Sequence, residues 1–469
     1  MNSHYNPDGW DTGELERAGA LARELRSIAG ANARVFAVRA PGRVNLIGEH
    51  TDYSGLPVLP AAIDRSTIIV AAAMESREVT LRNAAPDFAP RTFQLERRIP
   101  PFAQGDWANY VKAAVQGVID HFGALGVALA RLRGAALFVE GRITTAAGLS
   151  SSSALTVASA LAFMAVNGLD LPPLECAPMV ARSERYVGTM GGGMDQAAAL
   201  FGRRDHALFI EFNPLRVRPV RMPSDAAIIV ADSGEIADKS GSARAEYNRR
   251  VVECALAARI LARTLKLQGV RTLGDVVSAR VNWNATDLVG ILERAAPARL
   301  APDLEEAKRL LDMTGISHES LLHELVGPGA SSVKLDPAKP LEIFRRARHV
   351  LTETERVIRA AELLEAGQLE AMGALMNESH ASLASDFECS TARLDKIAAS
   401  ARAGGALGAR LTGAGFGGSI VAMCRAADAP RVIESLDRFY YEPLGIEARG
   451  RRAVLHAGDG ASTIELAVA

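Results

Sequence analysis

Apolar residues first recur at helical spacing and then gather into short runs. Between residues 14 and 28, Leu15, Ala18, Leu21, Ala22 and Leu25 fall on one stripe, which predicts an amphipathic helix. Strand-like runs follow at 35–39, 66–71, 79–82 and 135–140. Helical patterns occupy 107–121, 152–166 and 174–186. The first half of the chain therefore mixes helices and strands.

The pattern breaks at Pro223 and Ser224, and the run AAIIVADSG that follows is typical of a buried strand. Later segments predict strands at 408–412 and 419–424, and helices at 243–264, 340–366, 369–384, 391–403 and 429–439. The stretch 270–345 is helical and rich in loops, and the sequence assigns it no role. Interleaved helices and strands in both halves predict an α/β (α+β) fold.

Bulk properties exclude several classes of partner. The 469 residues carry 53 basic and 54 acidic side chains, so a net charge of −1 provides no field to attract nucleic acid or an anionic membrane. The four cysteines are scattered without CxxC spacing, which argues against a zinc site. The N-terminus has no secretory pattern, and the most apolar segment, 154–166, is too short to span a bilayer. We therefore expect a cytoplasmic protein.

The first motif, Ala40–Tyr53 (APGRVNLIGEHTDY), gathers Arg43, Glu49, His50 and Asp52 beside two glycines. Carboxylates accept hydrogen bonds from vicinal hydroxyls, so Glu49 and Asp52 suit sugar recognition. Arg43 suits a phosphate or a developing negative charge. The alternative is a solvated turn with ordinary surface charges.

The serine loop, Ala146–Ala154 (AAGLSSSSA), follows a predicted strand and precedes an apolar helix. Free N–H groups and the partial positive charge at a helix N-terminus favour an anion, and the serine hydroxyls can contact a phosphate-bound Mg²⁺. The alternative is a serine-rich helix cap. The loop lacks the GxxxxGK[ST] pattern.

Two glycine-rich segments complete the set. The glycine turn, Ser183–Gln196, contains Gly191–Gly193 and then Asp195, a candidate general base, with Glu184 as a candidate magnesium ligand. The C-terminal glycine loop, Leu411–Val421 (LTGAGFGGSIV), can form an anion-binding nest. A capped loop and a bulged hairpin are the respective alternatives. Together, the four motifs are typical of a phosphoryl-transfer enzyme.

The order of these motifs, from about Val35 to Tyr441, resembles the GHMP kinase superfamily. GRVNLIGEHTDY looks like the galactokinase signature, GLSSSSA like the superfamily phosphate loop, and LTGAGFGG like its third motif. SERYVGTMGGGMDQ, IEFNPLR and LMNESHASL resemble the N-acetylgalactosamine kinase branch. Two segments depart from the family: Thr144 and Thr145 replace a usual proline, and 231–247 keeps Tyr247 but differs elsewhere.

The resemblance implies a role for each candidate residue. Asp195 would be the base and Arg43 would steady the transferring phosphoryl group. Sugar binding would fall to Glu49, His50, Asp52, Gly192 and Tyr247. Trp107, with Tyr110 as a second candidate, would border the adenine of ATP. The ATP phosphates would be wrapped by Gly148, Leu149, Ser150, Ser151, Ser152, Ser153 and Ala154, and Mg²⁺ would be held by Ser153 and Glu184.

The implied fold has two domains with the active site between them. An N-terminal domain similar to ribosomal protein S5 domain 2 would cover 15–222, and a ferredoxin-like C-terminal domain with helical insertions would cover 223–469. The implied reaction is phosphorylation of galactose at its anomeric hydroxyl. An N-acetylgalactosamine 1-kinase and a non-catalytic sugar and ATP sensor are the alternatives. The resemblance implies a small-molecule sugar substrate and no obligatory protein partner.

Overall fold

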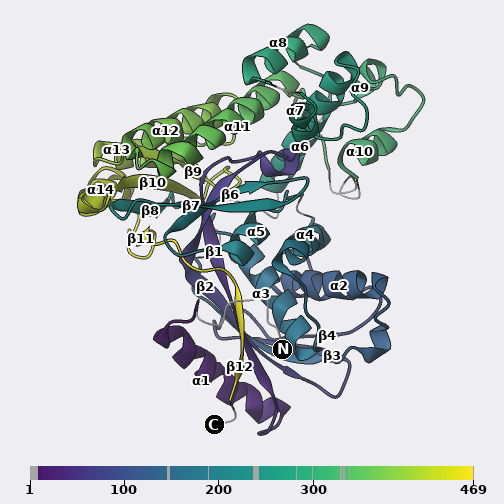
Figure 1. The fold of residues 1–469 in the computed structure, drawn as a ribbon, viewed down its shortest axis with the longest axis vertical. Coiled ribbons are helices and arrows are strands. Elements are labelled where there is room, and N and C mark those ends of the chain that lie inside the picture. The colour runs from purple at the N-terminus through teal and green to yellow at the C-terminus, as the bar shows by residue number, and fades with distance from the viewer. Residues whose placement is uncertain are drawn as a thin grey trace.

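A computed structural model describes residues 9–144, 148–188, 190–235, 242–280, 282–297, 299–327, 330, 333–336 and 338–467. Ala146 and Ala147 of the predicted serine loop, with Thr145 just before it, are not described, and neither are Thr189 of the glycine turn and 236–241. Two sheets, each with its own helices, lie one above the other in Figure 1. Mixed helices and sheets in both parts confirm the expected α/β class.

The lower part is organised by a six-stranded sheet with the order β12-β1-β2-β5-β3-β4. Its neighbours are antiparallel except for the parallel pair β3 and β5. The strands are β1 Val35–Ile47, β2 Leu59–Ala73, β3 Glu78–Asn83, β4 Arg91–Gln94, β5 Ala135–Gly141 and β12 Ser462–Leu466. The last strand of the chain thus pairs with the first.

Helices cover both faces of this sheet because its central strands are apolar on both sides. Val35 and Ala37 face α1, whereas Val38 and Ala40 belong to the core on the opposite face. Figure 1 shows α1 alone on one side and the other helices across the sheet. These helices are α1 Thr12–Ala29, α2 Ala108–Ala124, α3 Ser151–Val166, α4 Pro173–Ser183 and α5 Met194–Phe201.

The upper part is built on a four-stranded antiparallel sheet with the order β11-β8-β10-β9. Its strands are β8 Ala226–Asp232, β9 Gly408–Thr412, β10 Ser419–Arg425 and β11 Arg452–Leu455. A hairpin of β6 His206–Glu211 and β7 Arg216–Arg221 precedes it. Three helices accompany the sheet: α12 Leu369–Ser385, α13 Ala392–Ala403 and α14 Ala429–Leu436.

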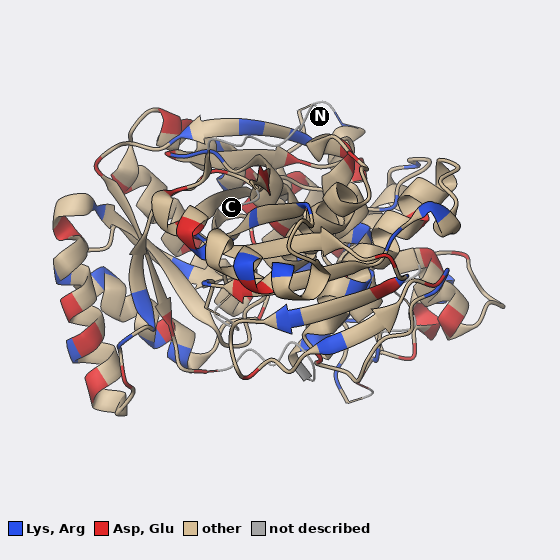
Figure 2. Cartoon of the chain, turned by 90° about the horizontal axis from the view of Figure 1, so that it is seen from below, with Lys and Arg blue, Asp and Glu red and all other residues tan. Residues whose placement is uncertain are grey.

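The long segment between β8 and β9 is largely helical. Its leucines and alanines share a second apolar core with β8, β9 and β10. The helices are α6 Ser242–Thr264, α7 Leu273–Ser278, α8 Ala285–Ala295, α9 Glu305–Leu310, α10 His318–Val326 and α11 Ile343–Glu365. None of the described helices combines the length and apolar character that a membrane span requires. Basic and acidic positions are interspersed along helices and strands (Figure 2).

Two structural details go beyond the sequence prediction. β1 continues past Arg39 to Ile47, because a bulge between Pro41 and Arg43 accommodates a proline that has no N–H to donate. β12 returns to the N-terminal sheet, although residues after 222 were assigned to the C-terminal domain. The division between 15–222 and 223–469 stays a prediction.

The packing of α1 allows a stability prediction. Leu25 lies on the face of α1 that packs against the sheet and is 1% exposed, whereas Leu15 on the same helix is 42% exposed. Leu25→Ala should lower the free energy of unfolding by about 2–5 kcal/mol, because it removes buried methyl groups and leaves a cavity. Leu15→Ala, the matched control, should change it by less than about 1 kcal/mol. Denaturant titration measures both, and equal losses would contradict this packing.

Candidate functional site

Arg43 and Asp195, 152 residues apart in the sequence, form the central contact of the site. Nε and Nη2 of Arg43 each lie 2.7 Å from Oδ1 of Asp195. The Arg43 side chain is 4% exposed, and the Asp195 side chain keeps 26% of its surface open. Nη1 of Arg43 donates to the carbonyl of Gly148 at 2.6 Å. One buried guanidinium therefore connects β1, α5 and the serine loop.

Close backbone contacts bring the serine loop to β1. The Arg43 N–H donates to the Leu149 carbonyl, and a Cβ added at Gly42 would lie 2.6 Å from that oxygen. Gly148 has a φ of +72°, and a Cβ there would lie 2.7 Å from the Thr412 carbonyl. Only glycine fits these two positions without displacing the backbone.

Serine hydroxyls from this loop hold the second oxygen of Asp195. Ser150 Oγ donates to Oδ2 at 2.6 Å, and Ser153 Oγ lies 3.4 Å from the same atom. α3 begins at Ser151 with no side chain capping its first turn, and its N-cap residue Ser150 is left-handed with a φ of 55°. The free N–H groups of this 16-residue helix therefore face the site, as an anion requires.

Asp52 joins the first motif to the glycine turn. Its Oδ2 accepts hydrogen bonds from the N–H groups of Gly192 at 3.0 Å and Met194 at 3.4 Å. A Cβ at Gly192 would lie 2.2 Å from the Asp52 carbonyl carbon, so no larger residue fits this approach. Burial, aided by the negative charge of Asp195, raises the pKa of Asp52 to about 6.

Glu49, a predicted sugar-binding residue, is almost completely buried. Its carboxylate accepts from the Gly413 N–H at 2.6 Å, from Arg410 Nη1 at 2.8 Å and from the Asn45 amide. Burial raises the pKa of Glu49, and the charge of Arg410 opposes that shift. The first motif is thereby tied to the C-terminal glycine loop.

Arg410 and Glu353 complete this buried network and were missed by the sequence analysis. Both side chains are fully buried, with Arg410 Nη2 3.8 Å from Glu353 Oε1. Glu353 also accepts from the Gly48 N–H at 2.9 Å, and nearby charges hold its pKa down at about 2. An arginine within the otherwise apolar strand β9 was the signal available in the sequence, since a charge there needs a buried partner.

His50 lies in an aromatic cluster beside the site. Its ring stacks on Phe387 with centroids 4.4 Å apart, and the Tyr247 ring is 5.5 Å away. Nε2 lies 3.2 Å from the Ala414 carbonyl, and the Tyr53 hydroxyl lies 3.3 Å from Nδ1. Burial lowers the pKa of His50 well below its usual value, which leaves a neutral ring that donates through Nε2 and accepts through Nδ1.

These residues enclose a small cavity of about 110 Å³, called the first cavity below. Most of the predicted catalytic and sugar-binding residues line it: Arg43, Glu49, His50, Asp52, Asp195 and Tyr247. Glu184 lines it as well, and Gly192 supplies the N–H that holds Asp52. The structure thus brings together residues from the first motif, the glycine turn and α6.

Glu184 carries a buried oxygen, Oε1, with no hydrogen-bond partner among the described residues. Burial and the charge of Asp195 raise the pKa of Glu184 to about 7, opposed by hydrogen bonds with Ser153, Gln196 and Thr156. An unsatisfied carboxylate oxygen beside serine hydroxyls fits a hard cation that keeps most of its other ligands from water and phosphate. In the described part of the chain, no three His, Cys, Asp or Glu side chains form a metal cluster.

Trp107 lies apart from the first cavity, at the start of α2. Its indole N–H donates to the Ala89 carbonyl at 3.1 Å, and its ring lies 6.0 Å from Phe88. Tyr110, one turn further along α2, hydrogen-bonds with Ser152 of the serine loop. The adenine-binding role of Trp107 stays a prediction.

Family models match three parts of the chain. The galactokinase galactose-binding signature covers residues 24–73, the GHMP kinases N-terminal domain 109–203 and the GHMP kinases C-terminal model 360–442. The galactokinase of Lactococcus lactis, in a crystal structure complexed with galactose, superposes with a TM-score of 0.73 at 28% identity over 94% of this chain and 98% of that one. Mevalonate kinase shares the fold, with a TM-score of 0.51 at 16% identity over 90% of this chain and 99% of the other. The fold and the site therefore define a GHMP kinase.

Sequence relatives narrow this class further. A galactokinase of Dictyostelium discoideum is 34% identical over 87% of this chain and 84% of its own length. One from Roseiflexus is 34% identical over 91% and 92%, and one from Saccharomyces cerevisiae is 34% identical over 82% and 81%. The chain belongs to the galactokinase family.

The buried network gives a prediction for Arg410→Met. Removing one partner leaves Glu49 buried without its counter-ion, so the free energy of unfolding should fall by about 3–5 kcal/mol. Burial raises the folded-state pKa of Glu49, so its protonated form favours folding and the loss should shrink as pH falls. Urea titrations of wild type and variant at several pH values measure this.

The matched control is Arg359→Met, which breaks an exposed pair with Glu362 whose side chains are 61% and 59% exposed. Its loss should stay below about 1 kcal/mol at every pH. If Arg410→Met lowered the free energy of unfolding no more than this control, the buried network would not hold the first motif against β9 as described above.

Proposed function

We propose that this protein transfers the γ-phosphoryl group of ATP to the anomeric hydroxyl of galactose, giving galactose 1-phosphate and ADP. The observation that carries the proposal is the placement of Arg43 and Asp195 on the wall of a cavity that also contains Glu49, His50 and Asp52. Family membership supports it, and so does the structural likeness to a galactokinase complexed with galactose.

In this mechanism, Asp195 accepts the proton of the anomeric hydroxyl as its oxygen bonds to the γ-phosphorus. The bond between that phosphorus and the β,γ-bridging oxygen breaks, and ADP leaves with the electron pair. Arg43 stabilises the charge that develops on the transferring group. Because Arg43 and Ser150 fix both oxygens of Asp195, the base is oriented before the substrate arrives.

Sugar recognition falls to the hydrogen-bonding groups around the first cavity. Asp52 Oδ2 is occupied by the glycine turn, so its other oxygen is the acceptor for sugar hydroxyls. Glu49 is held by Arg410 and Gly413 and contributes through its remaining lone pairs. The Tyr247 hydroxyl, whose pKa burial raises well above its usual value, stays protonated and can donate.

ATP phosphates bind at the N-terminus of α3, where the first-turn N–H groups are uncapped. Ser153 and Glu184 would hold Mg²⁺, and the unsatisfied Oε1 of Glu184 supports this assignment. When bound, Mg²⁺ neutralises charge on the β and γ phosphates. Glu184 must lose its proton to act as a ligand, so it also couples metal binding to pH.

A coupled ADP-release assay tests the reaction directly. Galactose should support turnover, and mevalonate and glucose should not, since the sugar-binding groups are arranged for one hydroxyl pattern. N-acetylgalactosamine and galactosamine belong in the same panel, because efficient turnover of either in place of galactose would reassign the substrate. If no sugar in the panel released ADP, the catalytic proposal would be wrong and the sensor alternative would gain support.

Asp195→Asn should lower kcat by about 10²–10⁴, the usual contribution of a general base. The amide keeps the size of the side chain but cannot accept the proton. Sugar binding, measured by calorimetry, should survive in the variant. Asp64→Asn on the exposed part of β2 is the control and should retain activity. Unaltered kcat in Asp195→Asn would remove Asp195 from the mechanism.

The Mg²⁺ requirement should depend on pH through Glu184. Below its pKa of about 7 the carboxyl holds a proton that the metal must displace. The Mg²⁺ concentration for half-maximal rate should therefore rise by up to about tenfold per pH unit below pH 7. Glu184→Gln should raise this concentration and flatten its pH dependence, whereas exposed Glu175→Gln on α4 should change neither. Identical pH profiles for wild type and Glu184→Gln would exclude Glu184 as a ligand.

A further inference from the structure

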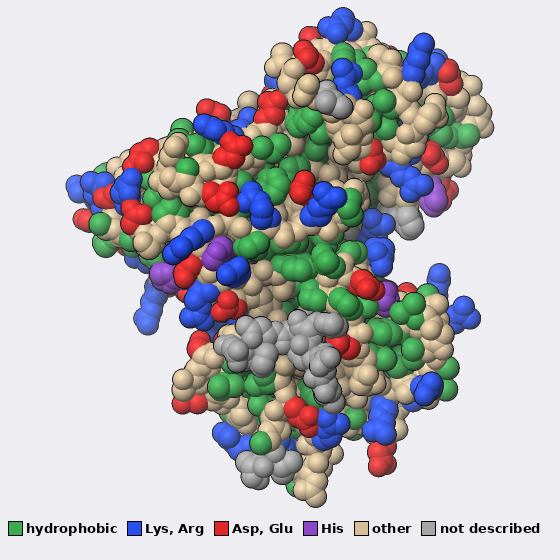
Figure 3. All heavy atoms as spheres, in the orientation of Figure 1, with side chains coloured by type: hydrophobic (Ala, Val, Ile, Leu, Met, Phe, Trp, Pro, Cys, Tyr) green, Lys and Arg blue, Asp and Glu red, His purple; other side chains and the backbone are tan. Residues whose placement is uncertain are grey.

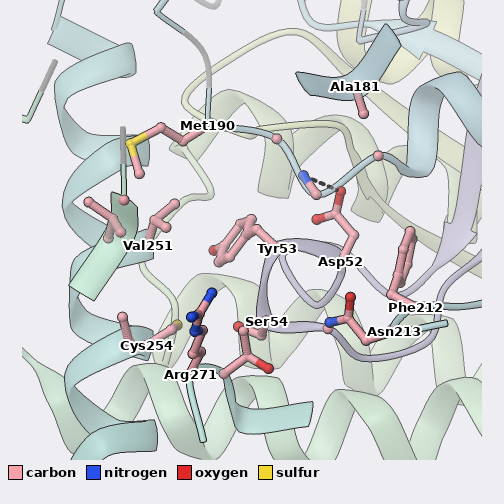
Figure 4. Close-up of a pocket in the computed structure, with 18 of the residues that line it drawn as sticks. Asp52, Tyr53, Ser54, Ala181, Met190, Phe212, Asn213, Val251, Cys254 and Arg271 are labelled. Carbon is pink, nitrogen blue, oxygen red and sulfur yellow. Dashed lines mark hydrogen bonds between the residues drawn. The ribbon is translucent and has the colours of Figure 1, made fainter. Parts of the chain in front are cut away.

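A second, larger cavity of about 720 Å³ lies directly behind the wall of the first. Asp52, Gly191 and Gly193 line both cavities, so the glycine turn and the side chain that holds it form a shared wall. Figure 4 shows Asp52 facing this second cavity while its hydrogen bond fixes the turn. A hollow between the upper and lower parts of the molecule is visible in Figure 3.

The second cavity is built by two different parts of the fold. α4 and the loop between β6 and β7 form one side, and α6, the start of α7 and the end of α10 form the other. Residues of the stretch 270–345, to which the sequence assigns no role, therefore complete the cavity. This helical segment therefore forms part of the wall of the second cavity, next to the candidate active site.

Positive charge predominates on the lining. Nη2 of Arg259 lies 3.0 Å from Oε1 of Glu324, so these two opposite charges neutralise each other. Arg185 and Arg271 have exposed side chains with no hydrogen bond or ion pair to any described residue, and Asp52 is the remaining acidic residue of the lining. Figure 4 shows the Arg271 guanidinium directed into the cavity. Two unpaired guanidinium groups suit a phosphate, which they can bind through charge-assisted hydrogen bonds.

The rest of the lining suits a ring that bears hydroxyls. Tyr53 and Phe212 present aromatic rings, and Asn213 an amide, toward the cavity in Figure 4. Ser54 is only 3% exposed, and apart from the Cys254 thiol its hydroxyl has no hydrogen-bond partner among the described residues. A buried polar atom with unused hydrogen-bonding capacity points to a polar ligand.

We propose that the second cavity is an effector site for a sugar phosphate, and that its occupation weakens binding of the substrate sugar through the shared Asp52 wall. The effect on the substrate rests on the proposed function, because the substrate sugar would occupy the first cavity. An anion beside Asp52 disfavours the charged carboxylate, which is the form that accepts hydrogen bonds from sugar hydroxyls. By linkage, substrate and effector must weaken each other equally.

The test titrates sugar phosphates while the first cavity is filled. Wild-type protein saturated with galactose, Mg²⁺ and a non-hydrolysable ATP analogue should still bind one equivalent of sugar phosphate by calorimetry. Galactose 1-phosphate, the product of the proposed reaction, and galactose 6-phosphate, which comes from another source, form separate arms. Inorganic phosphate should bind at least about tenfold more weakly, since it lacks the ring and hydroxyls.

Matched double variants assign the binding to this cavity. Arg185→Ser with Arg271→Ser should raise the dissociation constant about tenfold or more, because charge-assisted bonds are lost. Arg182→Ser with Arg280→Ser removes the same charge from two arginines that are also exposed but lie outside the lining, and it should leave binding unchanged. Ala181→Phe, which fills the cavity from α4, should also abolish binding. Thermal unfolding of each variant checks that it is folded.

Initial-rate assays complete the design. Galactose 6-phosphate should raise the KM for galactose in wild type and in the control pair, but not in the Arg185 and Arg271 pair. Galactose 1-phosphate is left out of the rate assays because, as the product of the proposed reaction, it competes with galactose in the first cavity of every variant. The proposal is overturned if the filled wild type binds no sugar phosphate, if the two pairs bind it equally, or if inorganic phosphate binds as tightly. Absence of galactose turnover in every protein would instead refute the proposed function, whatever the binding data show.

Discussion

The ion pair between Arg43 and Asp195 is the contact on which the site depends. It joins the bulged second half of β1 to the first turn of α5, and the same guanidinium holds the carbonyl of Gly148. Three segments that are distant in sequence are thereby fixed to one buried side chain. The pair thereby holds these segments together. Because Asp195 remains partly exposed and lines the first cavity, the same pair can also take part in the proposed phosphoryl transfer.

A second buried charge network supports this arrangement from the opposite side. Arg410 on β9 faces Glu49 of the first motif and Glu353 of α11, so the upper sheet and its helices are locked to the end of β1. Buried ion pairs contribute little net stability, but leaving one partner alone is costly. The network therefore contributes more to the relative position of the two parts than to net stability, because Arg410 must lie within reach of both Glu49 and Glu353.

Local signals in the sequence predicted much of this structure. The stripe of Ala18, Leu21 and Leu25 predicted α1, and the apolar run after Ser152 predicted α3, because each pattern reflects one buried face. The first motif was interpreted partly through its resemblance to a family, and Asp52 and Asp195 do line a common cavity. The continuation of β1 beyond Arg39 was not predicted, because Pro41 and Gly42 are unusual within a strand. They are accommodated by a bulge, which depends on the partner strand β2.

Features that depend on distant partners could not be predicted in this way. The pairing of β12 with β1 joins the two ends of the chain, and nothing in the local pattern of Ser462–Leu466 specifies that neighbour. The roles of Arg410 and Glu353 exist only because three elements meet around them. The second cavity likewise arises from surfaces of α4, α6 and α10 that have no common sequence signature.

The most direct test of the central claim is a crystal structure with galactose, Mg²⁺ and a non-hydrolysable ATP analogue bound. The account predicts the anomeric oxygen within about 3 Å of an Asp195 carboxylate oxygen and about 3–3.5 Å from the γ-phosphorus, with Arg43 on the same side. A sugar bound elsewhere, or one whose anomeric hydroxyl points away from Asp195 toward Asp52, would contradict it.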